Sequence, residues 1–319
     1  FFCDLEMQFP PTEEAGLLTT RYGGHCRPSQ LAMLRVLLWK NLLLQWRRWR
    51  VLAMTFSFVL YAGMLLGFSL MLRSLAATAA PNKRDEVRLI FAQVMGLLAP
   101  LLVCLAQISV VQPLVAEMVF DKESKMKVVQ LVNGLPISVY WAAYAGQYSI
   151  YAVIFGIGFT VVLKFVCLPL SSMVLVFLTL ELGYFQMFAM GMVIVTVFSK
   201  ASTAASVVGV VNLWALVPSF LGSLGLKSSD AIWYALGFLP CISVVGILKV
   251  VVALEAGGFD SSGQPVLPAG WEIGPAFWEL PPLKPDGEGG LEQGGLPPPG
   301  ILFTMLVFQT LAGLLLAIW

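Results

Sequence analysis

VLAMTFSFVLYAGMLLGFSLML, residues 51–72, contains no charged side chain and is long enough to cross the hydrocarbon core of a bilayer as an α-helix. Such a helix needs about 20 apolar residues, because each residue advances about 1.5 Å through a core of roughly 30 Å. The rest of the chain has a similar character. Of its 319 residues, 58% are hydrophobic and 12% are charged, and the mean hydropathy is +0.84. These values exclude a water-soluble globular protein.

Five further stretches share this length and apolar character, so the sequence predicts an all-α membrane protein with six transmembrane helices. The predicted spans are 51–72, 89–116, 138–163, 173–198, 201–226 and 301–319. A shorter apolar run begins at residue 231 and is interrupted by Gly237 and Pro240. We therefore expect residues 231–254 to form a re-entrant helical hairpin on the outer side, where neighbouring helices would satisfy its freed backbone groups.

The distribution of lysine and arginine predicts that the N-terminus and, with six spans, the C-terminus both face the cytoplasm. More than half of the 19 basic residues fall on the cytoplasmic side in this orientation, in agreement with the positive-inside rule. The strongest element is the cluster of Arg47, Arg48 and Arg50 next to the first span. An opposite signal comes from the first outer loop, which contains Arg73, Lys83, Arg84 and Arg88.

Three segments are expected to lie outside the hydrocarbon core. Residues 1–28 predict an N-terminal tail, followed by a membrane domain over 29–319. Residues 31–50 predict a helix on the membrane surface, although an extension of the first span is an equally good interpretation. Its apolar stripe would contain Leu31, Leu34, Leu38, Leu42 and Trp49, with Lys40, Asn41, Arg47 and Arg48 opposite. The Gly- and Pro-rich residues 257–300 predict an irregular outer loop, with Trp271, Phe277 and Trp278 resting on the interface.

The polar composition excludes several kinds of function. The net charge is +1, so no nucleic-acid partner is expected. The 5 cysteines form no CxxC pair and His25 is the single histidine, so the sequence indicates neither a disulfide framework nor a metal site. Because the first residue is Phe1 and not methionine, we expect the chain to be part of a longer protein.

A charged segment between the second and third predicted spans carries the functional prediction. Residues 122–132 predict a short amphipathic helix, which Gly134 and Pro136 would end. One face would contain Ser124, Val128, Leu131, Val132 and Leu135, and the other Lys122, Glu123, Met126, Lys127, Gln130 and Asn133. A helix of this kind on the cytoplasmic side can lie flat and be held by a partner, but a passive solvated loop is the alternative interpretation.

Several short motifs, in the same order, resemble the A subfamily of ABC transporters, a group that moves lipids. The resemblance covers most of residues 31–319. Its strongest part is Asp121-Lys122-Glu123 followed by Lys127, Asn133-Gly134-Leu135 and Tyr140-Trp141, which is similar to the signature after that family's second span. Weaker parts are Leu38-Trp39-Lys40-Asn41-Leu42-Leu43-Leu44 before the first span, Phe198-Ser199-Lys200-Ala201 between spans four and five, and Leu239-Pro240 in the expected hairpin.

The resemblance implies an ABC-2 type transmembrane domain with a type II exporter-like arrangement. The coupling helix would contain Asp121, Lys122, Glu123, Lys125, Lys127, Asn133, Gly134 and Leu135. It also implies a second transmembrane half, membrane lipid as the substrate, and a nucleotide-binding domain after Trp319 that would bind ATP and Mg. The chain itself contains no GxxxxGK[ST] loop, so no cofactor and no enzymatic activity are expected of it. Only residues 73–88 separate the first two spans, whereas full-size members carry a large extracellular domain there.

Two further features are candidates for function within the membrane. Glu181 is an acidic residue inside a predicted span, which suggests a substrate or proton path, although a hydrogen bond to a neighbouring helix is an equal alternative. Ala201, Ala205 and Gly209 form a stripe of small residues that predicts close helix packing, including packing between two halves.

Two other functional classes are alternatives to an ATP-driven lipid transporter. A membrane-embedded enzyme is disfavoured because the spans contain no paired histidines or aspartates. A secondary transporter that does not use ATP would show inverted repeats and charged residues at mid-membrane. The chain shows no clear repeat, which disfavours this class, and a secondary transporter is therefore the second choice.

Overall fold

The computed structural model describes residues 29–78, 84–223, 242–256, 258–259, 265–266, 271 and 299–318. Within these residues the chain is helical apart from one short antiparallel pair, β1 (Gly258–Phe259) and β2 (Pro265–Val266). The helices are α2 (Gln30–Arg47), α3 (Arg50–Thr78), α4 (Arg84–Glu123), α5 (Met126–Val132), α6 (Ile137–Val166), α7 (Met173–Val197), α8 (Ala201–Ser223), α10 (Ile242–Ala256) and α12 (Pro299–Ile318). The predicted tail, His25, the first arm of the hairpin and most of the outer loop, including Phe277 and Trp278, lie outside the described residues.

The all-helical fold and its membrane character are confirmed. Within the described part of the chain, four segments are long and apolar enough to cross a membrane, namely Arg50–Leu75, Val94–Glu123, Ile137–Val166 and Met173–Val197. Over the described residues, the apolar parts of α8, α10 and α12 are shorter. The arrangement of six spans with a re-entrant hairpin therefore stays a prediction.

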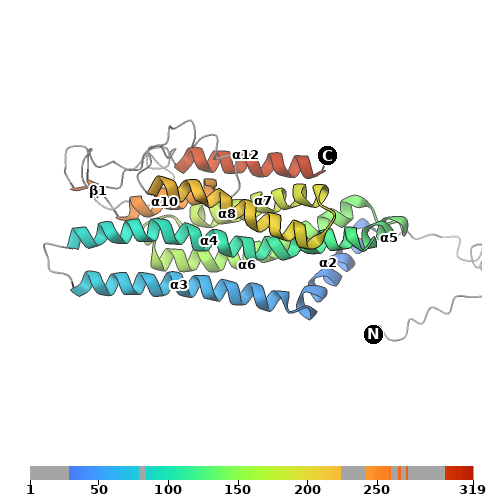
Figure 1. Cartoon of the computed structure of the whole chain (residues 1–319), viewed down its shortest axis with the longest axis horizontal. Helices are drawn as coiled ribbons and strands as arrows, with labels where there is room; N and C mark the ends of the chain where they lie inside the picture. Colours follow the sequence, from blue (N-terminus) through green and yellow to red (C-terminus); the bar gives the residue numbers. More distant parts are fainter. Residues whose placement is uncertain are drawn as a thin grey trace, which may run out of the picture.

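The long helices lie roughly parallel, and successive ones run in opposite directions (Figure 1). Helices α2 and α5 lie at one end of this bundle, and α10 and β1 lie at the other. Helix α12 runs toward the end that holds α5. We call these the α5 end and the α10 end.

Helix α4 lies at the centre of the bundle, whereas α3 lies at its edge. Helix α4 packs against α3, α8, α10 and α7. Of its most apolar window, 67% is buried, compared with 17% for the window of α3. Pro100 and Pro113 lie inside α4, and a membrane helix tolerates proline because neighbouring helices can satisfy the freed backbone groups.

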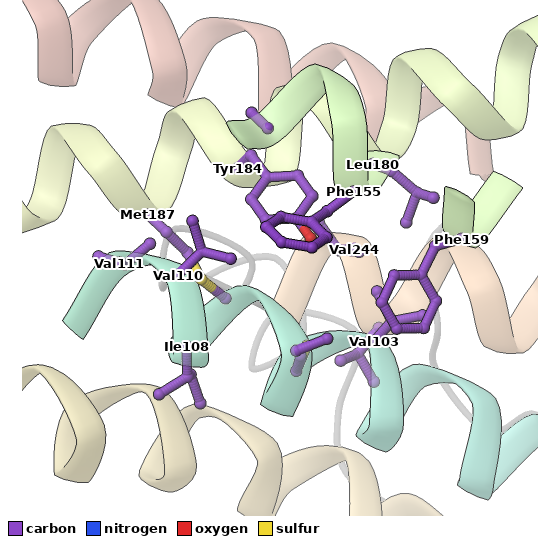
Figure 2. Close-up of a cluster of buried hydrophobic side chains, with 14 of the residues drawn as sticks. Val103, Ile108, Val110, Val111, Phe155, Phe159, Leu180, Tyr184, Met187 and Val244 are labelled. Carbon is purple, nitrogen blue, oxygen red and sulfur yellow. The ribbon is translucent and has the colours of Figure 1, made fainter. Parts of the chain in front are cut away.

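The core lies where α4, α6, α7 and α10 meet, and Figure 2 shows part of it. Close approach at this point depends on glycine. A Cβ at Gly183 would lie 2.6 Å from Val244 Cγ2 of α10 and 3.0 Å from Gln107 Nε2 of α4. A Cβ at Gly191 would lie 2.6 Å from Val115 Cγ2 of α4. Helix α7 thus has two positions at which only glycine fits without rearrangement.

Helix α2 is separate from α3. Trp49 lies between them with a φ of 57°, and the two helix axes meet at a corner (Figure 1). The interpretation of residues 31–50 as a continuous extension of the first span is therefore wrong. The predicted apolar stripe is also wrong in part, because the side chains that α2 buries are Leu37, Asn41 and Gln45. Trp49 and Leu31, both placed on that stripe, are 72% and 75% exposed. The polar Asn41 and Gln45 turn inward because α2 packs on α6, close to the carboxylate of Glu117.

At the α10 end, polar contacts hold the turn between α6 and α7. The Glu255 carboxylate accepts hydrogen bonds from the backbone N–H of Leu170 at 2.9 Å and from the Ser171 hydroxyl at 2.6 Å. Trp271 is fully buried beside this turn, so its predicted place at the membrane interface is wrong. Its backbone N–H donates to Ser171 Oγ, and its carbonyl accepts from the N–H of Ser172, the residue before α7. The start of α7 is therefore fixed.

Candidate functional site

The charged motif is divided between two helices, so the predicted single helix over 122–132 is wrong. Helix α4 continues to Glu123, the chain turns at Ser124 and Lys125, and α5 begins at Met126. Lys125 has a φ of 59°, a left-handed conformation that ends the first helix. Lys122 and Glu123 thus project from the end of a long span and not from a freely placed loop.

The predicted end of the amphipathic helix is confirmed. Gly134 has a φ of 86°, which L side chains rarely adopt. Its N–H donates to the Leu131 carbonyl at 3.0 Å, and the Leu135 N–H donates to the Gln130 carbonyl at 3.1 Å. These two bonds form a Schellman motif with Asn133 as the C-cap. The chain then passes Pro136 and enters α6.

Lys122 caps the C-terminal end of α7. Its ammonium donates to the carbonyls of Val195, Thr196 and Phe198 at 3.2, 3.0 and 3.1 Å. The last carbonyls of a helix have no partner within the helix and carry partial negative charge. A lysine ammonium has three N–H donors, and Lys122 uses all of them on this helix end.

Glu123 caps the next helix. Its carboxylate accepts a hydrogen bond from the backbone N–H of Ala201, the first residue of α8, at 3.1 Å. Negative charge is favourable at a helix N-terminus. Adjacent residues of opposite charge therefore hold the two ends of the α7–α8 turn, and we call Lys122 and Glu123 the charged clasp. The sequence motifs at 121–123 and 198–201, far apart in the chain, meet here.

A buried polar network lies next to the charged clasp. Asp121 accepts a hydrogen bond from the Tyr144 hydroxyl of α6 at 2.7 Å. One turn earlier, Glu117 is 3% exposed, accepts a hydrogen bond from the Gln45 amide, and lies 3.6 Å from Arg50. Glu117 was not among the predicted site residues, although a carboxylate directly after the predicted second span was a usable signal.

Lys127 attaches α5 to α6. Its ammonium lies 4.6 Å from the ring centroid of Trp141 and 5.4 Å from that of Tyr140, which are cation–π distances. Burial and the nearby charge of Lys122 lower the pKa of Lys127 below its ordinary value. The four groups border a pocket of about 240 Å³.

The outward face of α5 is apolar. Val128, Val129 and Val132 are 56%, 50% and 80% exposed, whereas Leu131 is half-buried. Most of the predicted apolar face therefore points away from the bundle. Lys127 and Gln130 approach the bundle instead, because the aromatic pair on α6 provides a site for a cation. Exposed valines on a short helix are typical of a surface that a partner covers.

Glu181 lies in α7 and is 7% exposed. Among the described residues neither of its carboxyl oxygens has a hydrogen-bond partner, so the alternative of a bond to a neighbouring helix is not what the structure shows. A Cβ at Gly156 of α6 would lie 2.1 Å from Glu181 Oε1, so this glycine provides the space for the carboxyl group. A substrate or proton path at Glu181 remains a prediction.

Because its carboxyl group is covered and unpaired, replacing Glu181 by an apolar residue should stabilise the protein. We expect Glu181→Leu to raise the free energy of unfolding by about 1–3 kcal/mol, measured by thermal unfolding in detergent micelles. Glu117→Leu is the matched control and should lower it, since it leaves Gln45 and Arg50 without their partner. If both changes lowered the free energy of unfolding equally, the carboxyl group of Glu181 would have a favourable interaction that offsets the cost of covering it.

The predicted small-residue stripe lies on α8, which packs on α4. Ala201, Ala205 and Gly209 are half-buried, and the most buried positions are their neighbours Ala204 and Val208. A Cβ at Gly209 would be 3.8 Å from Gln112 Nε2, an ordinary contact distance. Gly183 and Gly191 on α7 make the close approaches to α10 and α4 described above. They were not predicted, because the expected stripe had a small residue at every fourth position, and Met187 stands midway between these two glycines.

The described residues contain no group of three or more His, Cys, Asp or Glu side chains that could hold a metal ion. The polar side chains at the α5 end instead hold helix ends and bind one another. No model of a known protein family matches the chain, and no curated protein matches it.

Proposed function

We propose that this chain is the transmembrane domain of an ATP-driven transporter that moves membrane lipids, coupled to a nucleotide-binding domain through α5. The observation that carries the proposal is that α5 and the end of α4 are tied to three other helices. Lys127 contacts α6, Lys122 holds the end of α7, and Glu123 holds the start of α8.

With these attachments, α5 and the end of α4 could transmit movement to α6, α7 and α8. A displacement of α5 would shift the aromatic pair on α6 directly. Through the end of α4, the charged clasp would carry the same displacement to the α7–α8 turn. A ligand changes the arrangement of the helices only if it binds two arrangements with different affinity. The exposed valines of α5 provide a surface on which a nucleotide-binding domain would make such differential contacts.

The proposed arrangement has six spans, α3, α4, α6, α7, α8 and α12, and α10 belongs to a re-entrant hairpin. Helix α10 has 15 residues, fewer than the roughly 20 that a span requires. The alternating directions bring the end of α12 to the α5 end (Figure 1). A nucleotide-binding domain after Trp319, with its ATP and Mg, would then lie on the side of α5. The exposed face of α3 leaves room for a second transmembrane half or for lipid.

The test uses protein purified from its native membrane, so that any attached nucleotide-binding domain is retained. In proteoliposomes with a fluorescent phospholipid, we expect ATP-dependent movement of the lipid between leaflets. Val128→Ser with Val132→Ser should abolish this movement while leaving ATP hydrolysis and thermal stability in place, because both side chains are exposed. Val36→Ser, at an exposed position of α2, is the control.

A secondary transporter is the second candidate, and the covered carboxyl of Glu181 favours it. The same assay separates the two classes. Transport driven by a proton gradient without ATP, and unaffected by the two valine changes, would replace the ATP-driven proposal.

A further inference from the structure

The pocket at the α5 end lies between the ends of α4, α5, α6 and α7. Its volume is about 240 Å³. The lining residues are Met118, Lys122, Lys127, Tyr140, Trp141, Val195 and Thr196. Two ammonium groups, two aromatic rings and apolar side chains therefore share one hollow.

The pocket contains two ammonium groups, and among the described residues neither forms an ion pair with a carboxylate. The three donors of Lys122 are occupied by the carbonyls of α7. Lys127 contacts the two aromatic rings, and among the described residues it has neither a carboxylate nor a hydrogen-bond acceptor within reach. Burial, together with the like charge of Lys122, lowers the pKa of Lys127. An anion in the pocket would relieve this repulsion and accept the N–H groups of Lys127.

Exposed apolar side chains stand close in the chain to the residues that line the pocket. Val197 follows the lining residue Thr196 and is 70% exposed, and Ile137 lies one helical turn before Trp141 and is 54% exposed. Val132, at the end of α5, is also exposed. A small free anion would gain nothing from contact with these apolar side chains, whereas the acyl chains of a lipid would cover them.

The whole α5 end is basic. Its described acidic residues are Glu117, Asp121 and Glu123, each already bonded to a neighbouring group. Its described basic residues are Arg35, Lys40, Arg47, Arg48, Arg50, Lys122, Lys125, Lys127 and Lys200. An excess of positive charge next to the bilayer attracts anionic lipids to this end.

We propose that this pocket binds the phosphate group of an anionic phospholipid from the leaflet at the α5 end. Lys127 supplies the charge, Trp141 and Tyr140 hold its ammonium in place, and Val197 and Ile137 lie along the acyl chains. The site would exist whether or not the chain moves lipids, so its test does not depend on the proposed function.

The probe is dioleoyl phosphatidylglycerol, titrated against the purified protein in a neutral detergent and followed by native mass spectrometry. We expect wild-type protein to retain this lipid in preference to phosphatidylcholine. Lys127→Gln should weaken retention about fivefold, which corresponds to about 1 kcal/mol for one basic side chain near the membrane surface. Lys125→Gln, two residues away and outside the pocket, is the matched control and should retain the lipid as wild type does.

A thermal unfolding curve for each variant checks that it is folded. We expect both to be folded, because the side chains of Lys127 and Lys125 make no hydrogen bond among the described residues. Equal loss in both variants would show a diffuse charge effect and overturn the proposed site, as would wild-type retention by Lys127→Gln. Inorganic phosphate, added at the same concentration as the lipid, should not displace it. Displacement would show that the occupant is a soluble anion and not a lipid.

Discussion

Lys122→Met is expected to lower the free energy of unfolding by about 2–3 kcal/mol, the range for hydrogen bonds to a charged group combined with a favourable charge at a helix end. Methionine keeps an unbranched side chain only one atom shorter than that of lysine, but it removes all three donors. The carbonyls of Val195, Thr196 and Phe198 then lose their partner. Thermal unfolding in detergent micelles measures the effect, and faster hydrogen exchange at Ala201 and Ser202 would show that the α7–α8 turn has loosened.

Lys125→Met is the matched control for this change. Lys125 lies three residues further along the chain, is exposed, and caps no helix end with its side chain. We expect its effect on unfolding to stay within about 0.5 kcal/mol. If Lys122→Met were as mild as this control, the charged clasp would not stabilise the turn, and the proposed transmission through α7 and α8 would lose its physical basis.

Gly183→Val is expected to destabilise the protein by about 3 kcal/mol, at the upper end of what overpacking costs in a core. The new Cβ would lie 2.6 Å from Val244 Cγ2, and the branched side chain has no free space between α7 and α10. It would also press on the Gln107 amide, which donates to the Leu180 carbonyl at 3.3 Å. A lower unfolding temperature in micelles is the expected measurement.

The control for the glycine change is Gly67→Val in α3. A Cβ at Gly67 has no heavy atom within 4 Å, and the residue is exposed. The same substitution there should be neutral or stabilise the helix by a few tenths of a kcal/mol, since valine forms helices better than glycine. Similar losses at both positions would contradict the close approach of α7 to α4 and α10.

The long helices could be predicted from the sequence because a span is defined by a local property. Residues 173–198 and 138–163 coincide closely with α7 and α6, since charges or helix-breaking residues stand at both ends of each. Helix α4 begins before residue 89 and continues past 116. Its charged C-terminal end is held by the side chains of Lys122 and Glu123, which bond to other helices, and a local hydropathy pattern does not contain such contacts.

The site was predictable in its residues but not in its geometry. The motif at 121–135 identified Lys122, Glu123 and Lys127, yet the amphipathic pattern placed them on one continuous helix. The left-handed turn at Lys125 has no marker in the sequence, because such a turn normally requires glycine or asparagine. Likewise, the inward direction of Gln45 follows from the position of Glu117, which lies 72 residues away in the chain. Contacts of this kind depend on tertiary packing.

Helix α7 is anchored at both of its ends, by Lys122 at one and by Ser171, Glu255 and Trp271 at the other. A helix that is held at both ends is expected to move as one rigid body, so a displacement that reaches α7 through the charged clasp would also be felt at its α10 end. The peripheral α3, which is separated from α2 at Trp49, is less covered by its neighbours, because 17% of its most apolar window is buried, compared with 61% for α7. If the molecule alternates between two shapes, spin labels on α3 should change their separation from α7, while labels at opposite tips of α7 keep theirs.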